Sequence, residues 1–188
     1  CALAFAAILS SPLPASANLP PPLARLNVEV RSLARHIPAS IALDVLDLNT
    51  GYDAGFNARK SMPAASTIKL PVMVAVFEQL ASGRFDLNRR VTLEPDDRDY
   101  GSGELSDAPV GTTYAVSELL EKMIDVSDNT ATNMLIRLIG RRTINREMGT
   151  LGLLTTHLAG DVRTDGWGIR RTLRTSPADL VHLLTLMA

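Results

Sequence analysis

Apolar residues recur with helical spacing in several stretches of the chain, and these stretches define the predicted helices. Residues 26–36 carry apolar side chains every three or four positions, which predicts a short amphipathic helix. Residues 69–81 are apolar on nearly all sides, so we expect a buried central helix, with Pro71 in its first turn, where a missing N–H costs little. Further helices are predicted at residues 116–124, 130–139 and 176–187.

A β-hairpin is predicted near the start of the domain. Residues 41–48 and 52–60 are strand-like, and the Asn-Thr-Gly sequence between them is typical of a turn. Predicted helices therefore outnumber predicted strands. The fold class indicated is mixed α/β, with a helical lobe and one hairpin of an antiparallel sheet.

The first residues have the pattern of a targeting segment. Residues 1–9 form an uninterrupted apolar run, and residues 14–17 end in the small-x-small sequence that signal peptidase accepts. We therefore interpret residues 1–17 as part of a signal peptide and residues 18–188 as the mature domain. The apolar run is too short to span a bilayer, so we expect an exported protein, periplasmic or secreted, without a stable membrane anchor.

Composition and charge exclude several classes of function. With 188 residues, 46% of them hydrophobic, the chain can bury the core of a single domain. A net charge of −1 and a pI near 6.3 give no electrostatic footprint for nucleic acid. The three histidines have no ligand spacing and the mature part has no cysteine, so we expect no metal and no cofactor. We expect a monomer with a small-molecule substrate.

Two short motifs carry the candidate chemistry. An S-x-x-K sequence at residues 66–69 puts a hydroxyl and an amine on one face of a helix that begins at the serine. A serine hydroxyl needs a neighbour that takes its proton, and lysine can do this once burial lowers its pKa. An S-D-N sequence follows at residues 127–129. Either motif alone also fits a capped helix start or a turn, so their combination carries the argument.

This combination resembles the signature of class A-type serine β-lactamases and penicillin-binding proteins. Other short segments are similar to successive landmarks of that family, in the same order, and the resemblance extends from about Arg25 to the last residue. These segments are residues 47–51, 56–58, 62–67, 101–105, 127–133, 151–153 and 175–180. The resemblance implies a β-lactamase/transpeptidase-like fold.

Roles for the motif residues follow from the resemblance. Ser66 is similar to the nucleophile that becomes acylated, and Lys69 to its proton acceptor. Ser127 resembles the relay that hands a proton to the leaving nitrogen. Asn129 resembles the residue whose amide binds the acylamino group of the substrate, whereas Asp128 is expected to brace the turn.

A glycine-containing loop at residues 100–103 adds two candidate substrate contacts. Tyr100 and Ser102 flank Gly101 in a stretch that can form a tight loop at the mouth of the site. Tyr100 either walls the pocket or is a surface tyrosine, and the sequence favours neither interpretation.

The chain departs from the family in the loop before residues 175–180. The glutamate that orients the deacylating water in class A enzymes is absent, and Asp161 and Asp165 are the carboxylates of this loop. Either could activate water, but a loop aspartate is more often a turn-former or a surface charge.

The chain also lacks the K-T-G motif of the family. Lys60, Lys69 and Lys122 are its lysines, so no K-T-G follows the S-D-N sequence. In the family this motif lies on a strand that lends an oxyanion-hole donor. We therefore expect residues 18–188 to be an incomplete β-lactamase-like domain whose later strands are missing.

The sequence favours an exported serine β-lactamase that hydrolyses the β-lactam amide through an acyl-enzyme. The spacing of the two motifs and the Asp-Asn-Thr-Ala-Thr-Asn run support this interpretation. A penicillin-binding D,D-peptidase or transpeptidase is the alternative that the missing glutamate favours. A non-catalytic module that senses β-lactams is a third hypothesis.

Overall fold

The computed structural model describes residues 21–165, 168–169 and 172–188. The predicted signal peptide, residues 1–17, lies outside the described residues. Within the described part the chain forms α1 (Pro21–His36), α2 (Lys69–Ala81), α3 (Val116–Asp125), α4 (Asn129–Ile139), α5 (Arg141–Thr150) and α6 (Pro177–Met187).

Most helix predictions are confirmed to within one residue, and two differ. The central helix α2 has the predicted bounds, and Gly140 follows the last residue of α4 with a φ of 88°. Helix α1 begins at Pro21, five residues before the predicted start. Helix α5 was not predicted, because its sequence is polar and only Ile144 and Met148, one turn apart, are buried.

The strands are short and more numerous than predicted. The expected hairpin is present as β1 (Leu43–Leu46) and β2 (Asp53–Phe56), with Leu43 opposite Phe56. The prediction of a single hairpin was wrong, because three further antiparallel sheets lie within the described residues. Strands of two or three residues are too short for an alternating pattern to reveal them. They are β3 (Met62–Pro63), β9 (Leu173–Thr175) and β6 (His157–Leu158) in one sheet, β4 (Arg90–Thr92) with β5 (Thr113–Ala115), and β7 (Thr164–Asp165) with β8 (Gly168–Ile169).

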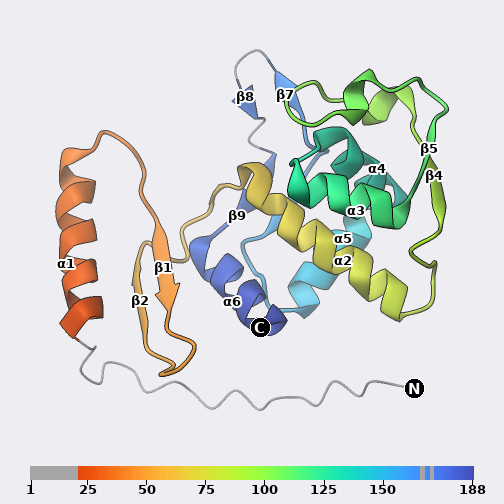
Figure 1. Cartoon of the computed structure of the whole chain (residues 1–188). Coiled ribbons are helices and arrows are strands. Elements are labelled where there is room, and N and C mark those ends of the chain that lie inside the picture. The colour runs from red at the N-terminus through yellow and green to blue at the C-terminus, as the bar shows by residue number, and fades with distance from the viewer. Residues whose placement is uncertain (1–20, 166–167, 170–171) are drawn as a thin grey trace.

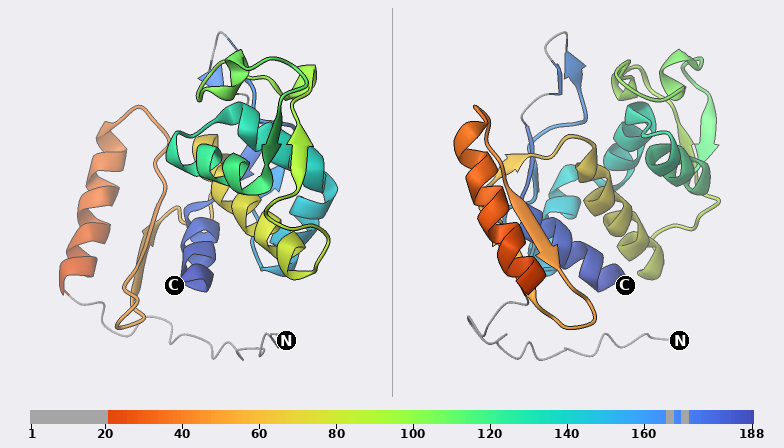
Figure 2. Two further views of the ribbon diagram at one scale, coloured as in Figure 1. Left: turned by 45° about the vertical axis from the view of Figure 1, so that its right-hand side comes forward. Right: turned by 60° about the vertical axis from the view of Figure 1, so that its left-hand side comes forward.

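Helix α1 and the β1–β2 hairpin lie to one side of a lobe formed by α2 to α5, with α6 between them (Figure 1). The two further views show the same arrangement (Figure 2). Helix α1 packs against β2, where the Arg31 guanidinium lies 5.4 Å from the centre of the Phe56 ring, and α6 packs against β1. The helical lobe therefore carries the main core.

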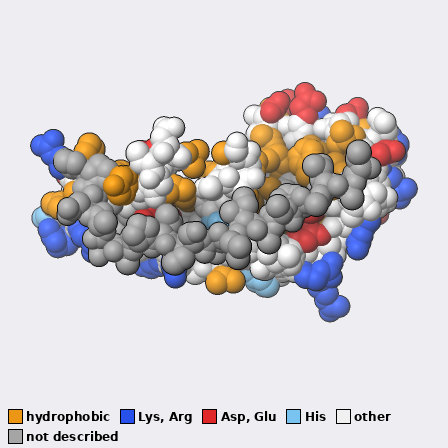
Figure 3. Space-filling view, turned by 90° about the horizontal axis from the view of Figure 1, so that it is seen from below, with side chains coloured by type: hydrophobic (Ala, Val, Ile, Leu, Met, Phe, Trp, Pro, Cys, Tyr) orange, Lys and Arg blue, Asp and Glu red, His pale blue; other side chains and the backbone are white. Residues whose placement is uncertain are grey.

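The core gathers around α2, which contacts α3, α4 and α5. Helix α2 itself buries the smaller side chains of Val72, Ala75 and Val76. The large, fully buried side chains come from the turn before α2, from α3, α4 and α5, and from strands β6 and β9; they include Ile68, Leu119, Met123, Met134, Leu135, Ile144, Met148, Leu158 and Leu173. Apolar side chains also reach the surface drawn in Figure 3. Leu184 and Leu186 on α6 are about half exposed. Tight packing around α2 fixes the start of that helix.

Two structural features are absent from the described residues. No helix in this part of the chain has the length and apolar character needed to cross a membrane. No group of three or more His, Cys, Asp or Glu side chains is arranged there to hold a metal ion.

Leu135→Ala should lower the free energy of unfolding by about 2–5 kcal/mol, because it removes a fully buried side chain and leaves a cavity beside α2. Leu154→Ala is the matched control, since Leu154 is 88% exposed and its loss should change stability by less than about 0.5 kcal/mol. Urea denaturation followed by circular dichroism measures both. Equal losses in the two variants would contradict the position assigned to the core.

Candidate active site

Ser66 lies in a short 3-10 turn, Ala65–Ile68, directly before α2. The turn is tied to β9, because the Ala64 backbone N–H donates to the Leu173 carbonyl over 2.9 Å. Ala65 has a φ of 48°, a left-handed conformation that costs free energy for a residue with a Cβ. Ser66 itself is exposed. A strained, anchored backbone therefore presents the hydroxyl to solvent.

Lys69, the first residue of α2, is buried and donates three hydrogen bonds. Its Nζ reaches the Ser127 carbonyl, Ser127 Oγ at 2.7 Å and Asn129 Oδ1 at 2.8 Å. The Ser127 hydroxyl in turn donates to Ser66 Oγ over 3.2 Å. The spacing of the first motif predicted that the amine would reach Ser66 directly. In the structure the two residues are linked through Ser127.

The environment of Lys69 lowers the pKa of its amine to about 8. Burial is the largest cause, because it disfavours the charged amine. The carboxylates of Asp128 and Asp99 act in the opposite direction and limit the fall. A substantial fraction of the amine is therefore neutral just above neutral pH, whereas an ordinary lysine would be almost wholly protonated.

Asp128 braces the turn, as the sequence indicated. Its fully buried carboxylate caps α4 by accepting from the Ala131 N–H at 2.8 Å. The same carboxylate accepts from the backbone N–H groups of Glu104 and Leu105. Gly103 has a φ of 98° and lies so close that a Cβ there would be 2.3 Å from Asp128 Cγ. The loop at 101–105 is thereby fixed to the S-D-N turn.

Ser127 is the second strained residue of the site, with a φ of 56°. The backbone that follows it is held by hydrogen bonds, from the Asp128 N–H to the Lys122 carbonyl and from the Asn129 N–H to the Ser102 carbonyl. Strain of this kind persists only where the surroundings enforce it, and it is common at functional sites. The conformation aims Ser127 Oγ at both Lys69 and Ser66.

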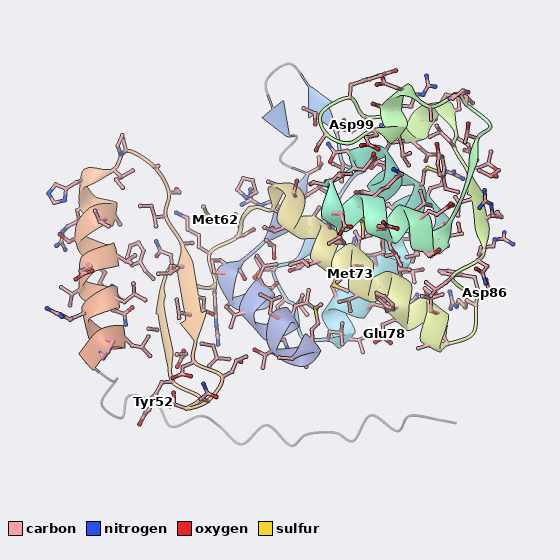
Figure 4. The ribbon with its side chains drawn as sticks, viewed as in Figure 1. Tyr52, Met62, Met73, Glu78, Asp86 and Asp99 are labelled. Carbon is pink, nitrogen blue, oxygen red and sulfur yellow. The ribbon has the colours of Figure 1, made fainter. Side chains whose placement is uncertain are left out.

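The Asn129 side chain contacts two residues that were not predicted from the sequence, Asp99 and Thr164. The Asn129 amide nitrogen donates to Asp99 Oδ1 over 2.7 Å and is 3.4 Å from Thr164 Oγ1. Figure 4 labels Asp99 close to strand β7, above α4. Asp99 lies in an acidic run, residues 96–99, that looks like a solvated surface turn in sequence, so no local signal marked it.

The remaining predicted site residues are more dispersed. Tyr100 is 73% exposed, and the Ser102 hydroxyl lies 3.5 Å from the Val126 carbonyl. The Asp161 carboxylate accepts from Arg141 at 2.7 Å and from Arg163 at 3.3 Å. It lines a separate cavity of about 590 Å³ together with Arg141. Asp165 belongs to β7 by its backbone, but its side chain lies outside the described part of the structure.

A family model for the β-lactamase enzyme family matches residues 25–188. This match covers most of the chain and includes both motifs. The chain therefore belongs to the β-lactamase enzyme family, within the superfamily of serine β-lactamases and penicillin-binding proteins.

Curated relatives include proteins named for two different activities. The β-lactamase ROB-1 of Haemophilus influenzae is 29% identical over 153 residues, which are 80% of this chain and 49% of that protein. The D-alanyl-D-alanine carboxypeptidase DacB2 of Mycobacterium tuberculosis is 30% identical over 130 residues, which are 66% of this chain and 43% of that protein. The chain thus spans about half the length of the curated relatives it matches.

Solved structures confirm the fold class. The structure of PBP-A superposes with a TM-score of 0.78 and 34% identity, over 85% of this chain and 59% of that one. A PBP-A variant, described as an acyl-enzyme complex with penicillin G, gives a TM-score of 0.79 and 35% identity, over 88% and 62% of the two chains. The fold is therefore β-lactamase/transpeptidase-like and mostly helical in the described residues.

Gly103→Ala should lower the free energy of unfolding by more than about 1 kcal/mol, because the new Cβ meets Asp128 and the φ is unfavourable. Gly149→Ala is the matched control. Gly149 lies in α5 with no atom near the added Cβ, so this change should stabilise the protein by up to about 1 kcal/mol. Thermal unfolding measures both, and a neutral Gly103→Ala would contradict the close approach of the loop to the turn.

Proposed function

We propose that the whole protein is a serine acyl-transfer enzyme whose Ser66 is acylated by β-lactams. The observation that carries this proposal is the chain of hydrogen bonds from Ser66 through Ser127 to the buried amine of Lys69. A hydroxyl becomes a useful nucleophile when a base of suitable pKa takes its proton. An amine with a pKa of about 8 is such a base.

The proton path follows from the donors and acceptors of the three groups. With Lys69 charged, its N–H donates to Ser127 Oγ, and the Ser127 hydroxyl donates to Ser66 Oγ. With Lys69 neutral, its lone pair accepts from Ser127, which frees Ser127 Oγ to accept the proton of Ser66. The same contacts therefore serve both directions of proton transfer.

In the acylation step each bond that forms is matched by one that breaks, and the proton taken from Ser66 is returned to the leaving group. Ser66 Oγ bonds to the carbonyl carbon of the lactam, and its proton passes through Ser127 Oγ to the Lys69 amine. The ring C–N bond breaks, and a proton returns through Ser127 to the leaving nitrogen. Ser127 is well suited to this step because it lies between the nucleophile and the base.

The loop before residues 175–180, which lacks the family's glutamate, favours a slow release of the acyl group, as in a penicillin-binding D,D-peptidase. Hydrolysis needs a base that positions water at the ester carbonyl. The Asp161 carboxylate accepts from Arg141 and Arg163, which commits it to ion pairs. The likeness to a PBP-A variant described as an acyl-enzyme complex with penicillin G, at 35% identity, supports the same form. Export, predicted from residues 1–17, stays a prediction, as does the monomeric state.

A reporter β-lactam such as nitrocefin should give a burst of about one equivalent followed by slow turnover, because the ester forms faster than it is hydrolysed. Intact mass spectrometry of the full protein should find the adduct on the peptide that carries Ser66. Ser66→Ala should abolish both the burst and the adduct.

Ser117→Ala is the control, since Ser117 is exposed on α3, away from the motifs. Fast steady turnover without an accumulating adduct would favour the β-lactamase alternative. A covalent adduct that persists in Ser66→Ala would contradict the nucleophile assignment. A folded protein that binds β-lactams without any adduct would identify a sensing module instead.

The acylation rate should rise with pH through a midpoint of about 8, because the neutral form of Lys69 is the base. From pH 7 to the alkaline plateau the rise should be about tenfold, the inverse of the neutral fraction at pH 7. Stopped-flow acylation at a series of pH values measures the profile. Lys60→Met, which removes an exposed lysine bonded to Ser40, should leave the midpoint in place. A profile flat from pH 6 to about 9 would exclude Lys69 as the base.

A further inference from the structure

Asp99 is a buried carboxylate beside the candidate active site, and its charge acts on Lys69 without direct contact. Only 4% of its surface is exposed. Burial raises the pKa of a carboxyl group, yet hydrogen bonds from Thr164, Asn129 and Gly101 outweigh that effect and hold the pKa of Asp99 below its ordinary value. Asp99 is therefore an anion at neutral pH, only one residue away from the Lys69 amine through Asn129.

The donors to Asp99 come from three segments that are far apart in the sequence. Oδ1 accepts from the Gly101 N–H at 3.0 Å, from Asn129 Nδ2 at 2.7 Å and from the Thr164 hydroxyl at 3.0 Å. Oδ2 accepts from the Thr164 N–H. One carboxylate thus joins the loop at 101, the start of α4 and the start of β7.

An ionised carboxylate only accepts hydrogen bonds, and this property fixes the Asn129 amide. Its NH₂ group must face Asp99, so its Oδ1 must face Lys69, where it accepts from Nζ at 2.8 Å. A flipped amide would place N–H donors against the lysine ammonium and an oxygen against the carboxylate. Both contacts would be repulsive.

We propose that Asp99 is a positioning residue that sets the orientation of the Asn129 amide and, through that amide and its own charge, the proton affinity of Lys69. This inference rests on the proposed function for its kinetic consequences, but its effect on Lys69 is a property of the folded protein alone. Asp128 is the other carboxylate that acts on Lys69, and it remains in place when Asp99 is changed.

Asp99→Asn is the informative variant, because it keeps the shape and removes the charge. A neutral amide has one acceptor oxygen, so at least one of the donors now faces an N–H, and the Asn129 amide is free to flip. Loss of the anion should lower the pKa of Lys69 below its value of about 8. Misplacement of the Asn129 amide should reduce the plateau acylation rate by about ten- to a hundredfold.

The titration of Lys69 can be followed directly by NMR of the full protein labelled at lysine. The 188 residues contain three lysines, and Lys69→Arg identifies the relevant signal. Asp99→Asn should move the midpoint of this signal to lower pH, and Asp99→Glu should restore it in part. Thr164→Val removes one hydroxyl but keeps the charge, so it should leave the midpoint near that of the wild type.

Asp97→Asn is the matched control for a purely structural role. Asp97 is as deeply buried and accepts from Arg137 and from the Glu94 N–H, but it does not contact Asn129. This variant should unfold at lower temperature with the Lys69 midpoint unchanged.

The outcomes separate the two proposals. A folded Asp99→Asn protein with an unshifted Lys69 midpoint would overturn the positioning role. A shifted midpoint in a protein whose wild type forms no β-lactam adduct would support the positioning role and contradict the proposed function. If Asp99→Asn fails to fold, Asp99→Ser decides, because it also removes the charge, and a Lys69 midpoint equal to that of the wild type in this variant would overturn the role.

Discussion

The burial of the Lys69 amine is the constraint on which the rest of the site depends. A buried ammonium is costly unless acceptors replace its water, and here three acceptors do so, two from Ser127 and one from Asn129. These acceptors must themselves be held in place. Asp128 provides this by capping α4, and Asp99 by anchoring the Asn129 amide. The S-D-N turn thus supplies all three acceptors of the Lys69 amine.

Two residues with strained backbones lie at the two ends of the hydrogen bond between Ser66 and Ser127. Ala65 and Ser127 both have positive φ angles, each beside a hydroxyl of the proton path. Relaxing either backbone would move a hydroxyl away from its partner, and relaxing Ser127 would also leave a donor of Lys69 without an acceptor. The strain at Ser127 therefore costs less free energy than an unsatisfied buried charge would. The Ser127 hydroxyl is preorganised because the buried amine needs it as an acceptor.

How much of this was predictable depends on the range of each interaction. The bounds of α2 and the chemistry of its first residue could be read from the sequence, because both are local. The Asp128 cap could be read for the same reason. Asp99 and Thr164 could not, because they join the site through contacts 30 to 65 residues apart in the chain. The short strands were missed since their pairing depends on tertiary packing rather than on alternation.

The two steps of the proposed reaction, acylation and deacylation, make different demands on a site. Acylation needs a base joined to the nucleophile, which the Lys69 and Ser127 contacts provide. Deacylation needs an acceptor with a lone pair free for water. Asp99 lies near Lys69, but its two carboxylate oxygens already accept hydrogen bonds from four donors. These donors lower the pKa of Asp99 and with it the basicity of the carboxylate. Asp161 is held by two arginines. A nearby carboxylate is therefore not by itself a general base, and neither Asp99 nor Asp161 is suited to activate water in the proposed reaction.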